Sequence, residues 1–141
     1  MLIISGPTYF VASAAIDRNS NSSAVFKMLF NAGTKVHGAS APFLFSNDTT
    51  PPAGPMNAKI SEIISSYYIS FITTLDPNTR RQQDAIFWPS YWSGTNETQD
   101  SDEPKGFRIL EITDNSIMIS TDSDVGPECD FWGAHGLDIS S

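Results

Sequence analysis

Residues 24–38 read AVFKMLFNAGTKVHG and combine an apolar run, a glycine-containing turn and a histidine. The apolar run over residues 24–30 is followed by Asn31 and Gly33, which are typical of the residues that bound a strand. The length of the run and its flanks predict a mostly buried strand. His37 follows the glycine-containing turn, where a rigid scaffold often presents a functional side chain on a loop.

The clearest helix of the sequence comes after this segment. Its apolar residues recur at three- and four-residue steps and are expected on one buried face: Ile60, Ile63, Ile64, Tyr67, Phe71 and Ile72. Asn57 or Ser61 is the candidate N-cap. Asp76 precedes Pro77 and is biased out of the helical region, so the helix is expected to end near Leu75.

The remaining elements are shorter. Residues 10–16 form a helix-compatible stretch, and residues 46–55 are expected to be a surface loop. Residues 107–112 and 117–121 are predicted to be two strands of a hairpin, joined by residues 113–116. We see no internal repeat.

Composition restricts the function. The 141 residues suit one domain, and 8 basic against 16 acidic side chains give a net charge of −8. Duplex nucleic acid and anionic membrane are therefore not expected as partners, because binding either needs a basic surface. The net charge resides in residues 97–130, which hold ten acids and two bases. A membrane span is not predicted, because no apolar run approaches the roughly 20 residues it requires.

Several features concern the compartment. The first seven residues lack the basic region and the long apolar stretch of a signal peptide. Sequons nevertheless make Asn21, Asn47 and Asn96 candidate glycosylation sites. Sequons without a signal indicate a secreted protein whose chain has lost its beginning. Cys129 is the one cysteine and cannot close an internal disulfide.

No metal or cofactor is predicted. Asp122 and Asp124 have the spacing that opens a calcium loop, but Gly133 stands where the closing glutamate belongs. These acids are expected in a solvated loop. One cysteine and two separated histidines give no support to a zinc site.

Two histidines are the candidate general bases for nucleophilic hydrolysis. His135 lies in a glycine-rich tail and is expected to be exposed and idle. His37 is the better candidate because of its place after the predicted strand. From these residues alone, a catalytic base and a structural loop histidine both stay open for His37.

A family resemblance favours the catalytic interpretation. Residues 33–45, GTKVHGASAPFLF, resemble the segment of type B carboxylesterases, lipases and cholinesterases that carries the triad histidine. Three further blocks agree in order: YYISFITTLDPN at residues 67–78, WPSY at residues 88–91, and CDFW at residues 129–132. The last block is similar to the closing Cys-x-Phe-Trp of many fungal members.

The resemblance implies an α/β fold, with a mostly parallel sheet between flanking helices. Residues 1–141 would form a single partial domain, the C-terminal part of an α/β-hydrolase. His37 would be the general base for a small-molecule or lipid ester, and the complete protein would be secreted. The nucleophile motif G-x-S-x-G occurs nowhere in the chain, and the triad acid has no identifiable position. Ser40 also departs from the acid that is common in the family.

The chain alone is therefore expected to be inactive. It is also expected to be poorly stable, because the strand near residues 25–30 would expose an edge that the rest of the sheet covers. Two alternatives stay open: a non-catalytic, cholinesterase-like binding or adhesion module, and an independent small α+β domain. The oligomeric state is left undetermined.

Overall fold

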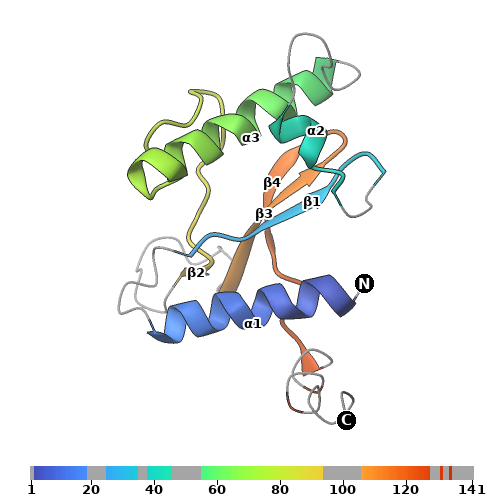
Figure 1. The fold of residues 1–141 in the computed structure, drawn as a ribbon, viewed down its shortest axis with the longest axis vertical. Coiled ribbons are helices and arrows are strands. Elements are labelled where there is room, and N and C mark those ends of the chain that lie inside the picture. Colours follow the sequence, from blue (N-terminus) through green and yellow to red (C-terminus); the bar gives the residue numbers. More distant parts are fainter. Residues whose placement is uncertain are drawn as a thin grey trace. The chain divides into compact units, whose positions relative to one another are not determined.

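The structure is a computed structural model, and it describes residues 2–18, 25–34, 38–45, 55–93, 106–127, 131 and 134. Figure 1 shows the helices and strands of the chain, coloured along the sequence. The chain divides into two compact units. Unit 1 comprises Met1–Lys27, Ser90–Ile109 and Thr121–Ser141, and unit 2 comprises Met28–Pro89 and Leu110–Ser120. A single partial domain over residues 1–141 stays a prediction.

Unit 1 contains α1 (Leu2–Arg18), β2 (Trp92–Ser93) and the beginning of β3 (Gly106–Thr113). The helix includes the predicted stretch at residues 10–16 and extends beyond both of its ends. β2 pairs antiparallel with β3, with Trp92 opposite Phe107. The Phe107 ring also contacts Tyr9 and Tyr91, at centroid distances of 5.7 and 5.1 Å. Aromatic packing therefore holds this unit together.

Unit 2 contains a parallel strand pair and most of a hairpin. β1 (Met28–Asn31) runs parallel to β3, with Met28 opposite Leu110. β4 (Ile117–Thr121) pairs with β3. Because three residues join these two strands, they pair antiparallel, and the predicted hairpin is confirmed. Among the described strands, β1 and β3 pair parallel, whereas β2 and β4 each pair antiparallel with β3. The expected parallel pairing is therefore observed between β1 and β3 only.

The strand before His37 differs from its prediction. The ladder with β3 begins at Met28 instead of residue 24, and all four residues of β1 are half-buried instead of mostly buried. Val25, which precedes β1, pairs with another segment instead of β3. Its carbonyl accepts a hydrogen bond of 2.7 Å from the Tyr91 N–H, within unit 1.

The helix α3 (Pro55–Thr74) agrees with its prediction in place and ends where Asp76-Pro77 indicates. Neither Asn57 nor Ser61 caps it, because both lie inside the helix. Its expected buried face is confirmed for four residues: Ile60, Ile63, Ile64 and Tyr67.

The expected burial of Phe71 and Ile72 is wrong. These side chains are 40% and 74% exposed. The buried stripe continues through Ser70, three residues after Tyr67, because Ser70 contacts the turn that follows the helix. Its hydroxyl donates to the Asp76 carbonyl at 2.6 Å and accepts from the Arg80 N–H at 2.8 Å.

Candidate functional site

The segment that carries His37 connects two elements of unit 2. β1 leads into it, and the short helix α2 (Ala41–Leu44) follows it. His37 itself lies outside the described residues, with its neighbours 35 and 36. The structure therefore describes the residues on either side of this histidine.

Gly33 fixes the first end of the loop. Its φ of 65° is in the left-handed region, which glycine adopts without steric penalty. Its N–H donates a hydrogen bond of 2.7 Å to Oδ1 of Asp114, in the connection between β3 and β4. The chain thus turns away from β1 at a point tied to the hairpin.

Gly38 and α2 fix the second end. Gly38 has a φ of 83°, and its carbonyl accepts from the Ala41 N–H at 3.0 Å. Phe43 is buried in α2, and its ring packs edge-on against the Phe30 ring, with 5.0 Å between the ring centroids. The Phe43 carbonyl accepts a hydrogen bond of 2.5 Å from the Ser61 hydroxyl of α3. The described residues on both sides of positions 35–37 are therefore anchored within one unit.

Most other residues singled out from the sequence lie outside the described residues. These are the three sequon asparagines Asn21, Asn47 and Asn96, together with Cys129 and His135. Ser40 is described and stands directly before α2.

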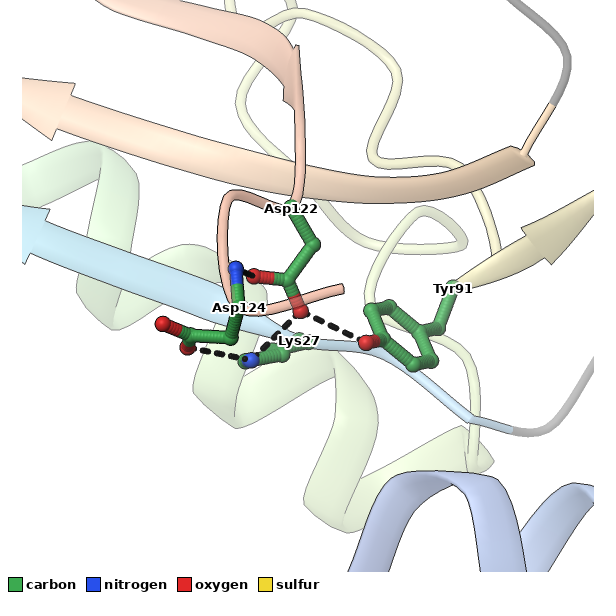
Figure 2. Close-up of polar contacts among 4 residues, drawn as sticks. All are labelled: Lys27, Tyr91, Asp122 and Asp124. Atoms are coloured by element: carbon green, nitrogen blue, oxygen red, sulfur yellow. Dashed lines mark hydrogen bonds and ion pairs between the residues drawn. The ribbon is translucent and has the colours of Figure 1, made fainter. Parts of the chain in front are cut away.

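A buried polar cluster in unit 1 was not predicted. Nζ of Lys27 contacts Oδ2 of Asp122 at 2.5 Å and Oδ2 of Asp124 at 3.0 Å. The Tyr91 hydroxyl donates to the same Asp122 oxygen at 2.6 Å, and the Asp124 N–H donates to Oδ1 of Asp122 at 3.0 Å. Figure 2 shows that Lys27 and Tyr91 approach this carboxylate from different segments of the chain.

The cluster holds Asp122 in its charged form. Burial by itself raises the pKa of this carboxyl, but hydrogen bonds from Lys27, Tyr91 and the Asp124 backbone outweigh burial and leave the pKa below its usual value. Burial, followed by the hydrogen bond to Asp122, raises the pKa of Tyr91. At neutral pH the tyrosine is therefore a neutral donor to a charged carboxylate.

The expectation of a solvated loop is wrong for Asp122, which is 4% exposed. The cation of Lys27 makes this burial possible, because an unpaired carboxylate would be strongly penalised. Lys27 is the lone charge in the apolar run 24–30, and that signal could have indicated a buried ion pair. The cluster is fully paired, so its chemistry is that of a structural contact.

The described residues contain no group of three or more His, Cys, Asp or Glu side chains that could hold a metal ion. Within the same part of the chain, no helix is long and apolar enough to cross a membrane.

No family model matches the sequence, and no curated protein matches it. The crystal structure of Aspergillus niger EstA, an esterase, is similar to this chain, with a TM-score of 0.71 and 24% sequence identity. The similarity covers 96% of this chain. The chain has an esterase-like fold. It spans 26% of the length of EstA, so most of that protein has no counterpart in these residues.

Proposed function

We propose that this chain is the part of a carboxylic ester hydrolase that supplies the triad general base, His37. The loop anchored at Gly33 and Gly38, in a chain with an esterase-like fold, is the observation that carries the proposal. The sequence resemblance to type B carboxylesterases and lipases, of the cholinesterase-like α/β-hydrolase family, supports the same role for this histidine.

The chemistry follows from an imidazole near neutral pH. His37 would take the proton of a serine hydroxyl as its oxygen attacks the ester carbonyl, and would return the proton to the leaving alcohol. An acid would orient the ring. Residues 1–141 contain no G-x-S-x-G motif and no identifiable triad acid. The serine and the acid would therefore come from a part of the domain outside these residues.

The hydrogen-bonded residues on both sides of His37 would support this chemistry. A general base must stay within hydrogen-bond distance of the hydroxyl throughout the reaction. The bond from Gly33 to Asp114 and the bond from Ser61 to the Phe43 carbonyl hold the described residues before and after His37. We propose that the substrate is a small-molecule or lipid ester. We also propose that the complete protein is secreted and carries glycans at Asn21, Asn47 and Asn96.

The test uses the longest open reading frame that contains residues 1–141. Hydrolysis of p-nitrophenyl esters is measured for this longer protein, for His37→Ala and for the matched control His135→Ala. Loss of a triad member lowers the rate by about 10⁴- to 10⁶-fold, so His37→Ala is expected to lose activity on this scale. His135→Ala is expected to keep it.

Comparable turnover in the longer protein and its His37→Ala variant would remove His37 from the mechanism. A longer protein in which another residue replaces the nucleophilic serine would favour the binding module instead. The 141-residue chain by itself is expected to show no turnover above the background hydrolysis of the ester.

A further inference from the structure

The helix α3 carries a second apolar stripe besides its buried face. Tyr68 and Ile72 lie four residues apart and therefore on one side of the helix, and Leu75 directly follows the last residue of the helix. Their side chains are 39%, 74% and 75% exposed, and the adjacent Ile69 is 58% exposed. A helix that is apolar on two sides is usually buried on two sides.

The composition of this part of α3 supports burial. Residues 63–75 contain no charged side chain on any side of the helix. A helix whose outer side faces water normally carries charged or polar residues there. The stripe Tyr68-Ile72-Leu75 instead presents two aliphatic side chains and an aromatic ring.

The backbone at Leu75 is a second, independent observation. Leu75 follows the last residue of α3 with a φ of 61°, in the left-handed region where glycine is the usual residue. A leucine there is strained, and its side chain is largely exposed within unit 2. Burial of this apolar side chain against another polypeptide would offset the cost of the backbone.

We propose that the stripe Tyr68-Ile72-Leu75 is the docking surface for the polypeptide that carries the remainder of the EstA-like domain. The chain accounts for 26% of the length of EstA, so a domain of that kind includes much further polypeptide. The occupant must be apolar, because the stripe offers no charge to a polar partner. The inference rests on that part of the proposed function which makes this chain one portion of a larger domain, and it is independent of the role of His37.

The experiment compares one substitution in two contexts. Ile72→Glu is introduced into the 141-residue chain and into the longest open reading frame that contains it. Thr73→Glu is the matched control, because Thr73 is an exposed neighbour on the same helix but lies outside the stripe. In the 141-residue chain, both substitutions are expected to shift Tm by a similar, small amount.

In the longer protein, Ile72→Glu would bury an unpaired charge and is expected to lower Tm by about 5–10 °C more than Thr73→Glu does. Leu75→Gly is expected to change Tm in opposite directions in the two proteins. It is expected to raise the Tm of the 141-residue chain by relieving the backbone, and to lower that of the longer protein by removing a docked side chain.

Equal effects of Ile72→Glu and Thr73→Glu in the longer protein would overturn the proposal. So would a reading frame that adds no polypeptide to residues 1–141. If the 141-residue chain forms a dimer that Ile72→Glu dissociates, the stripe binds a second copy of the chain. If the chain binds phosphatidylcholine vesicles through the stripe, its partner is lipid. Either result would also overturn the proposal. An inactive longer protein that is sensitive to Ile72→Glu would keep the docking surface while refuting the catalytic role of His37.

Discussion

The side-chain amide of Asn78 holds the backbone of Trp88 through two hydrogen bonds. Nδ2 of Asn78 donates to the Trp88 carbonyl at 2.8 Å, and Oδ1 accepts from the Trp88 N–H at 2.7 Å. Both residues are buried, and the Trp88 ring lies edge-on to Tyr67 at 5.4 Å between centroids. The Asp-Pro-Asn turn after α3 is thereby tied to the Trp-Pro segment that follows it. These two sequence blocks of the family resemblance are therefore parts of one structural contact.

Asn78→Ala is expected to destabilise unit 2. It leaves the N–H and carbonyl of Trp88 without these partners in a buried place, and each lost partner costs about 1–3 kcal/mol. We expect the free energy of unfolding to fall by about 2–4 kcal/mol, measured by urea denaturation followed by tryptophan fluorescence. Asn115→Ala is the control, because Asn115 is exposed in the hairpin connection. Equal losses in the two variants would contradict the importance of the Asn78 contact.

Lys27→Met is expected to destabilise unit 1. It leaves the buried carboxylate of Asp122 without its cation, and breaking a buried pair in this way costs about 3–5 kcal/mol. Asp122→Asn in the same chain is expected to recover part of this loss, because the uncompensated charge is gone. A double-mutant cycle from urea denaturation gives the coupling.

The control for this cycle is Lys59→Met. Lys59 pairs with Asp84 on the surface, and exposed pairs contribute little to stability, so this variant is expected to unfold almost like the parent chain. Additive effects of Lys27→Met and Asp122→Asn would show that the two side chains do not interact.

The stability of the chain is expected to fall in acid partly through Asp122. Its pKa is lower in the folded chain than in the unfolded chain, so the unfolded state binds the proton more readily. The stabilisation is complete above the unfolded pKa of about 4 and is lost as the pH falls through the folded pKa. Urea midpoints between pH 5 and pH 2 should fall less steeply in Asp122→Asn than in the parent chain. Parallel acid profiles would exclude Asp122 as a contributor.

Gly38 beside His37 is expected to tolerate asparagine better than alanine. Its φ of 83° is strained for alanine, and among the described residues other than its chain neighbours no atom lies within 4 Å of an added Cβ. Gly38→Ala is therefore expected to cost about 1–2 kcal/mol through the backbone alone. Asparagine visits this region more readily and should cost less. Urea denaturation of both variants tests the order, and a smaller loss for alanine would contradict it.

Local pattern was sufficient for several elements. The three- and four-residue spacing of Ile60, Ile63 and Tyr67 predicts α3 and its buried face, and Asp76-Pro77 predicts its end. The hairpin of β3 and β4 follows from two apolar runs around a polar connection. These features depend on residues close together in the chain, so the sequence alone determines them.

For the candidate site, the sequence predicts a histidine on a loop after a strand, and the structure supplies the anchors at both ends of that loop. The bond from Gly33 to Asp114 joins residues that are 81 positions apart, and no local pattern predicts such a contact. The role of His37 stays a prediction.

The positions of α3 and the hairpin could be predicted from the sequence, as could the place of His37 after a strand, because helix and strand periodicity are local properties. Tertiary structure alone decided that Asp122 is buried against Lys27 and that Ile72 faces outward. Burial depends on which distant segments cover a side chain, and a charge becomes tolerable inside a protein only when the fold brings its counter-charge to it.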